Sequence, residues 1–184
     1  MNTPNKLTVL RVILVPFFMA FMMIDPKNTA FVIIGLALFI VASITDAVDG
    51  HLARKHNLIT DFGKFMDPLA DKVLTTAAFL VLMHNGRASA VAVMLILTRE
   101  FIVSGIRLGA AGGGKVIAAS WWGKIKTIFQ MIAIIVALLL FLPIFPENVS
   151  VLVTDILVWM SAVITVVSGY DYVIKNIDLI KEAK

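Results

Sequence analysis

The chain has 184 residues, is 60% hydrophobic, has a mean hydropathy of +0.96 and carries a formal net charge of +4. This composition is far too apolar for a soluble domain, and the length allows one domain, which we expect to cover residues 1–184. Apolar runs that are continuous, not alternating, predict an all-α polytopic membrane protein and argue against a closed β-barrel. The absence of cysteine excludes disulfides and cysteine-ligated zinc.

Six apolar stretches follow one another along the chain, and each is close to the roughly 20 residues that a bilayer requires. The third begins between residues 61 and 67 and ends near residue 83. The other five cover about residues 7–24, 29–53, 88–110, 116–142 and 148–170. The sequence therefore predicts six transmembrane helices in a single domain.

Lysine and arginine are distributed unequally between the two sides that this topology defines. Twelve of them fall on the side that receives both termini, the 51–64 loop and the 107–126 segment, and only Lys27 and Arg87 fall on the other. The positive-inside rule then places both termini on the cytoplasmic side. Lys72 and Arg99 lie inside predicted spans. We expect Lys72 to extend its amino group toward the interface.

Four aspartates are the most informative polar residues of the chain. Asp46 and Asp49 are three residues apart and therefore about 60° apart on one helix face, and Asp67 and Asp71, four residues apart, are separated by about 40° on the next helix. The short connection makes these helices antiparallel neighbours. The four carboxylates can therefore converge in one cleft that faces the cytoplasm.

Carboxylates at membrane depth are costly, and four together repel one another unless cations neutralise them. Oxygen-only ligation suits Mg²⁺ or Mn²⁺, and two ions bridged by shared carboxylates match the arrangement used in phosphoryl transfer. Gly50 removes a side chain from the face of Asp46, which leaves room for a nucleotide, and Arg54 can bind a phosphate with two hydrogen bonds. The alternative, four unrelated charges at two helix ends, does not account for this spacing.

The complete pattern is Asp46-x2-Asp49-Gly50-x2-Ala53-Arg54-x8-Gly63-x3-Asp67-x3-Asp71. It resembles the signature of the CDP-alcohol phosphotransferase family, with every signature position filled. Members of that family transfer a phosphoalcohol or phosphatidyl group from a CDP-linked donor to an alcohol and release CMP. Residues 4–11, 98–107 and 123–127 are similar to one branch, the bacterial phosphatidylglycerophosphate synthases, for which the donor is CDP-diacylglycerol and the acceptor glycerol 3-phosphate.

The resemblance implies a role for each matching position. The metal ligands would be Asp46, Asp49, Asp67 and Asp71. Asp71 would also act as general base toward the attacking hydroxyl. The donor-binding residues would be Asn5, Thr8, Gly50, Arg54 and Thr60. The resemblance also implies a protein of the bacterial cytoplasmic membrane, with membrane lipids around it and a possible homodimer; nothing in the sequence indicates nucleic-acid binding.

Basic residues on the cytoplasmic side of the fourth and fifth spans are candidates for binding a phosphorylated acceptor. These are Arg99, Arg107, Lys124 and Lys126. A neutral alcohol would not require them. Arg99 could instead pair with Glu100 or an aspartate, and the other three could be interfacial anchors.

Two other functions stay open on the sequence alone. A transferase of the same family could use another acceptor, such as inositol phosphate, phosphatidylglycerol or serine. A small cation transporter would explain the acidic residues, but not Gly50 and Arg54 at their offsets, and its acidic groups should lie nearer to mid-membrane.

Overall fold

A computed structural model describes residues 3–55, 61–112 and 120–177; within these ranges the side chains of residues 3–5, 46–55, 61–65, 67–68 and 111–112 are outside the description. The described part consists of six α-helices without a strand, which confirms the all-α prediction. The helices are α1 (Thr3–Ile24), α2 (Thr29–Lys55), α3 (Asp61–His84), α4 (Ala90–Gly112), α5 (Trp121–Leu139) and α6 (Glu147–Lys175).

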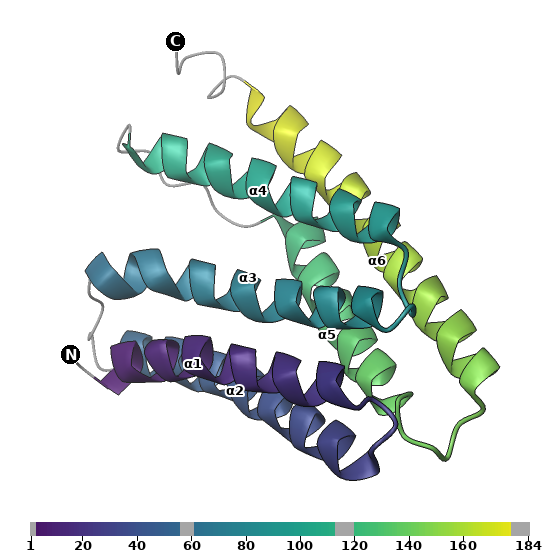
Figure 1. The fold of residues 1–184 in the computed structure, drawn as a ribbon. Coiled ribbons are helices and arrows are strands. Elements are labelled where there is room, and N and C mark those ends of the chain that lie inside the picture. The colour runs from purple at the N-terminus through teal and green to yellow at the C-terminus, as the bar shows by residue number, and fades with distance from the viewer. Residues whose placement is uncertain (1–2, 56–60, 113–119, 178–184) are drawn as a thin grey trace.

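Successive helices alternate in direction (Figure 1). The end of α2 and the start of α3 lie at one end of the molecule, together with the start of α1 and the end of α4. The α1–α2, α3–α4 and α5–α6 connections lie at the other. α1 packs against α2 and α3, and α6 packs against α4 and α5. α2 and α3 run antiparallel and contact one another, as predicted, whereas the assignment of their joined ends to the cytoplasmic side stays a prediction.

The predicted helix boundaries agree best with the structure where a short sequence motif, such as a helix cap, determines them. α1 ends at Ile24 and α2 begins at Thr29, as predicted, because Asn28 caps α2 by accepting a hydrogen bond from the Ala30 N–H at 3.0 Å. α3 begins at Asp61, the early limit of the predicted range, so Pro68 lies inside the helix.

Two predicted boundaries were wrong. α5 was expected to begin at residue 116, but it begins at Trp121, because the Ser120 side chain accepts a hydrogen bond from the Gly123 N–H and caps the helix. α6 was expected to end at residue 170 and continues to Lys175, where an i,i+4 ion pair with Asp171 at 2.7 Å supports the last turn.

The core contains apolar side chains from all six helices. Representative fully or almost fully buried members, one from each helix, are Phe18, Phe39, Phe79, Ile96, Ile134 and Val158. Many other large apolar side chains point outward, which suits a chain surrounded by lipid.

Within the residues described, three helices have both the length and the composition to cross a bilayer: α1 from Lys6, α5 and α6. The apolar part of α2 that is described, Thr29–Thr45, is shorter. α3 and α4 carry charged residues in their interiors, namely Asp71 and Lys72 in α3 and Arg99 and Glu100 in α4. The chain is thus an apolar helical bundle of the membrane-protein type, and the prediction of six complete spans goes beyond these three helices.

Candidate functional site

The four aspartates lie on the two helices that the sequence predicted. Asp46 and Asp49 are in the last part of α2, and Asp67 and Asp71 are in the first half of α3, at the end of the molecule where these helices adjoin (Figure 1). Of the four side chains only that of Asp71 is described, so the convergence of the carboxylates lies outside the described residues. Among described side chains, no group of three potential metal ligands occurs.

The donor-site prediction likewise falls mostly outside the description. Thr60 is in an undescribed segment, and the side chains of Asn5, Gly50 and Arg54 are not described. Thr8 is described and is fully buried in α1. Arg11, which the charge count grouped with the cytoplasmic residues, is also fully buried, one helical turn farther along α1. The sequence feature that could have predicted this buried charge is an arginine inside an apolar run.

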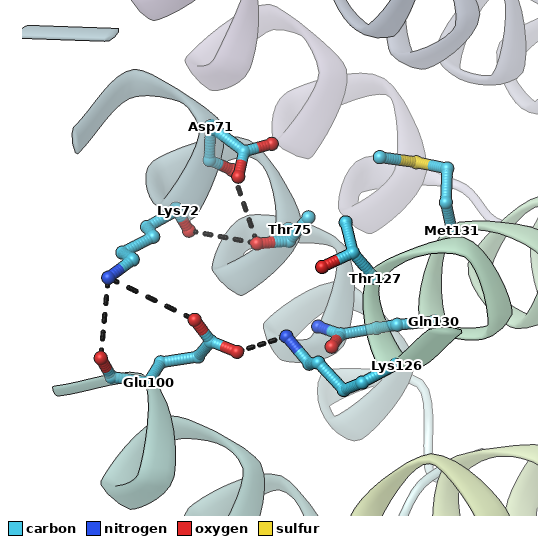
Figure 2. A pocket seen from close by; sticks show the side chains of 8 residues that line it. All are labelled: Asp71, Lys72, Thr75, Glu100, Lys126, Thr127, Gln130 and Met131. Carbon is cyan, nitrogen blue, oxygen red and sulfur yellow. Dashed lines mark hydrogen bonds and ion pairs between the residues drawn. The ribbon is translucent and has the colours of Figure 1, made fainter. Parts of the chain in front are cut away.

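A small, partly open pocket with many polar side chains adjoins Asp71 between α3, α4 and α5 (Figure 2). Its lining residues are Asp71, Lys72, Thr75, Glu100, Lys126, Thr127, Gln130 and Met131. Two of these were predicted as site residues, Asp71 as metal ligand and base and Lys126 as acceptor ligand. The structure therefore places a predicted catalytic residue and a predicted acceptor ligand around one cavity.

Glu100 is the centre of the charge cluster in this pocket. Its carboxylate forms an ion pair with the Lys126 amino group, and its Oε2 lies 3.9 Å from Lys72 Nζ. Lys72 Nζ also donates to the Glu100 backbone carbonyl at 3.3 Å (Figure 2). The prediction that Lys72 extends to the interface was wrong, because the Lys72 ammonium instead contacts the partly buried Glu100 on α4.

Arg99 is the third cation beside Glu100. Its Nη1 lies 3.5 Å from Glu100 Oε1, and its Nη2 donates to Ser168 Oγ on α6 at 2.7 Å. The arginine also lies against Gly169, where an added Cβ would be 2.6 Å from Arg99 Cγ. The pairing with Glu100, which was the alternative to acceptor binding by Arg99, is therefore present, and α6 supplies a second set of contacts that hold the guanidinium; acceptor binding by Arg99 stays a prediction.

The charges of this cluster do not balance. Lys72, Arg99 and Lys126 contribute +3 and Glu100 contributes −1, so these four side chains together carry +2, and the neighbouring Asp71 carboxylate lowers the net charge of the site to +1. A surplus of positive charge in a mostly buried site is costly unless an anion neutralises it. The cluster is therefore suited to bind a small anion next to Asp71.

Three of the four predicted acceptor ligands, Arg99, Arg107 and Lys124, lie outside the pocket lining. Arg107 Nε donates to the Tyr172 hydroxyl at 3.3 Å, and its guanidinium lies 5.4 Å from the ring centroid. Lys124 is exposed, with its Nζ 5.9 Å from the centroid of the Trp121 ring. Both contacts suit cations at an interface, and a role in acceptor binding stays a prediction for each.

Comparison with known proteins identifies the family. The family model described as CDP-alcohol phosphatidyltransferase matches residues 1–167, which include all four aspartates and the charge cluster around Glu100. The chain belongs to this family. It is a family of transferases that generally depend on a metal, so the transporter interpretation is excluded.

Relatives within the family share most of the chain. A CDP-diacylglycerol–glycerol-3-phosphate 3-phosphatidyltransferase of Bacillus subtilis is 45% identical, over 98% of this chain and 97% of its own length. A probable phosphatidylglycerophosphate synthase of Mycobacterium tuberculosis is 40% identical, over 94% of this chain and 80% of its own. The apo crystal structure of an M. tuberculosis phosphatidylinositol phosphate synthase superposes with a TM-score of 0.66, over 95% of this chain and 89% of that one. At 18% identity that last likeness supports the fold alone.

Proposed function

We propose that this family member transfers the phosphatidyl group of CDP-diacylglycerol to glycerol 3-phosphate, giving phosphatidylglycerophosphate and CMP, in phospholipid biosynthesis. The relatives at 45% and 40% identity, which carry names of this activity, support the proposal. The observation that favours a phosphorylated acceptor is the +2 cluster around Glu100 beside Asp71.

The cluster matches the charge of the proposed acceptor. A phosphate monoester carries about −1.5 to −2 charges near neutral pH and offers three strong acceptor oxygens. Lys126 and Arg99 would bind the phosphate group. Lys72, which like them lies beside the Glu100 carboxylate, would join them. Arg107 and Lys124 would attract the acceptor from the interface. Serine, which has no phosphate, would leave the surplus charge without a partner.

The donor and the metal would occupy the α2–α3 side of the site. Asp46, Asp49, Asp67 and Asp71 would hold two Mg²⁺ or Mn²⁺ ions, which the oxygen-only donor set and the meeting of the two helix ends support. When bound, the ions would neutralise charge on the donor pyrophosphate. Gly50, Arg54, Thr60, Asn5 and Thr8 would bind the donor itself.

Asp71 would take the proton of the attacking hydroxyl. In the proposed step, the acceptor oxygen forms a bond to the donor phosphorus next to the diacylglycerol. The bond from that phosphorus to the CMP oxygen breaks, and the hydroxyl proton passes to the Asp71 carboxylate. A phosphate held by the cluster would bring its hydroxyl toward Asp71, which lines the same pocket. We place this site at the cytoplasmic face of a bacterial membrane, where a water-soluble acceptor is available; a homodimer is part of the same proposal.

The deciding experiment is a CMP-release assay. The purified protein, supplied with CDP-diacylglycerol, glycerol 3-phosphate and Mg²⁺, should release CMP and form phosphatidylglycerophosphate in equal amounts, and chelation of the metal should stop both. A higher specificity constant with inositol phosphate or serine would move the acceptor assignment within the family. No CMP with any member of a panel of alcohols would refute the transferase proposal.

Replacing Asp71→Asn tests the base in the same assay. The amide keeps the size of the side chain but cannot accept the proton at neutral pH, so turnover should fall by about 10²- to 10⁴-fold. Binding of CDP-diacylglycerol, measured separately by calorimetry, should change little. A variant with near-normal turnover would remove Asp71 from this role.

A further inference from the structure

Gln130 is a buried polar residue of α5 that the proposed reaction has not used. It is 4% exposed and lines the pocket beside Asp71 and Lys126. Its Oε1 is buried and has no hydrogen-bond partner among the described residues. Buried acceptors are nearly always bonded, and one without a donor destabilises the protein. An oxygen of this kind on a cavity wall indicates a ligand that brings a donor.

Other polar side chains of the pocket already form hydrogen bonds or ion pairs within the protein. The Thr75 hydroxyl donates to the backbone carbonyls of Asp71 and Lys72, each at 3.2 Å, and the Thr127 hydroxyl donates to the Gly123 carbonyl at 3.0 Å. Lys72 and Lys126 direct their amino groups to Glu100 (Figure 2). Among the described pocket residues, Gln130 thus has a buried acceptor oxygen for which the chain supplies no donor.

The position of Gln130 relative to the cations suggests which part of the acceptor it meets. It lies four residues after Lys126, on the same face of α5, and its amide points from α5 toward the α3 side of the pocket (Figure 2). A phosphate dianion has only acceptor oxygens and cannot donate to Oε1. A hydroxyl group can, and glycerol 3-phosphate has two, of which one attacks the donor.

We propose that Gln130 is a specificity-determining residue whose Oε1 accepts a hydrogen bond from the acceptor hydroxyl that does not react. This inference rests on the proposed function and adds a contact for the polyol part of the acceptor to the phosphate contacts of the cluster. An alcohol phosphate without this hydroxyl would leave Oε1 buried without a donor. The site would then discriminate against such a compound even though the phosphate and the attacking hydroxyl are both present.

The test compares glycerol 3-phosphate with 3-hydroxypropyl phosphate, which keeps the phosphate and the terminal hydroxyl and lacks the middle one. The unaltered protein should prefer glycerol 3-phosphate by about 10- to 100-fold in kcat/KM, the range expected for a hydrogen bond to a buried acceptor. In Gln130→Met, which keeps the length and volume of the side chain and removes the acceptor, the preference should fall to about twofold or less.

A matched control is Thr127→Val in the same pocket. Its hydroxyl is already bonded to the backbone, so the preference between the two substrates should stay as in the unaltered protein. Because each preference is a ratio measured on one preparation, partial unfolding of a variant cancels out.

Three outcomes would overturn the inference. The first needs no variant and is the absence of any preference for glycerol 3-phosphate in the unaltered protein. The second is a preference in Gln130→Met equal to that of the unaltered protein, and the third is a loss of preference in Thr127→Val as large as in Gln130→Met. Turnover of glycerol 3-phosphate in these cases leaves the proposed function standing. Absence of turnover with both substrates refutes the proposed function together with this inference.

Discussion

Two regions of the bundle place a buried or half-buried arginine between helices, and they do so in different ways. At the α3–α4 connection, Arg87 Nη1 donates to the Leu140 carbonyl at 2.8 Å, and its guanidinium lies 3.8 Å from the centroid of the Phe141 ring. In the pocket region, Arg99 shares the single carboxylate of Glu100 with two lysines. The first arrangement joins a neutral carbonyl and a ring to one cation, whereas the second leaves two positive charges in excess.

The surroundings of Arg87 are those of a structural contact. Gly86 has a φ of +66° and ends α3 in a Schellman motif, in which the Arg87 N–H donates to the Leu82 carbonyl at 2.9 Å. The motif turns the Arg87 side chain toward the end of α5. Burial lowers the pKa of the guanidinium and the nearby Glu147 carboxylate opposes that shift, but an arginine stays charged in either case.

The comparison shows how a functional charge can be separated from a structural one in an apolar bundle. A structural cation forms its hydrogen bonds with groups of the protein itself. The cations of a binding site instead share fewer carboxylates than their number requires. If this criterion is correct, substitutions in the Glu100 cluster should change acceptor kinetics, and substitution of Arg87 should change stability alone. Three substitutions test this difference.

The largest effect is expected for Lys126→Met. The methionine keeps much of the packing in α5 but removes one cation, so the KM for glycerol 3-phosphate should rise by about 10- to 100-fold, as expected for a lost charge-assisted hydrogen bond. The KM for CDP-diacylglycerol should change by less than about threefold. Steady-state CMP release with each substrate varied in turn measures both.

The matched control for this change is Lys175→Met. Lys175 has a 61% exposed side chain and pairs with Asp171 on the surface of α6, so its loss removes one positive charge from the protein without touching the pocket. Equal effects of the two substitutions would mean that net charge, not the cluster, controls acceptor binding.

The sequence predicted the helices more completely than the site. Sequence patterns report on residues that are close along the chain, whereas the site is formed by residues that are far apart along it. The end of α1 and the start of α2 follow from Asn28 and its neighbours, and the aspartate spacing lies within two consecutive helices. Glu100, by contrast, meets Lys126 and Lys72, which are 26 and 28 residues away along the chain. Periodicity reports which residues share a face of one helix, not which faces meet.

Gln130 was missed for a related reason. It is one polar residue in the long apolar run of α5. Such a residue, like a charged residue within a membrane span, requires a hydrogen-bond partner and is therefore a candidate site residue. The late start of α5 was also hard to predict, because Ser120 had no distinguishing neighbour and only the structure shows that its side chain is bonded to Gly123. The aspartate site itself stays a prediction from the sequence, because three of its four side chains are not described and the fourth, Asp71, shows only its place in the pocket lining.

A smaller effect is expected for Gly169→Ala on α6. The new Cβ would lie 2.6 Å from Arg99 Cγ and 3.5 Å from its Nε, so the arginine must move away from Ser168. We expect a rise of about three- to tenfold in the KM for glycerol 3-phosphate, because Arg99 is displaced and not removed. Gly105→Ala on α4 is the control, since an added Cβ at that position meets nothing within 4 Å. If both alanines act alike, helix propensity and not the position of Arg99 explains the change.

The smallest kinetic effect is expected for Arg87→Met. Loss of the guanidinium removes the hydrogen bond to the Leu140 carbonyl and the contact with Phe141, which together should lower the free energy of unfolding by about 1–3 kcal/mol. For a chain of this size that corresponds to a fall of roughly 2–12 °C in the midpoint of thermal unfolding, while both KM values and kcat stay within about twofold. Lys27→Met at the same end of the molecule is the control, because Lys27 is exposed and its removal should leave the midpoint unchanged. A selective rise in the KM for glycerol 3-phosphate with Arg87→Met would contradict the criterion, since an arginine whose hydrogen bonds come from the chain should not take part in binding the acceptor.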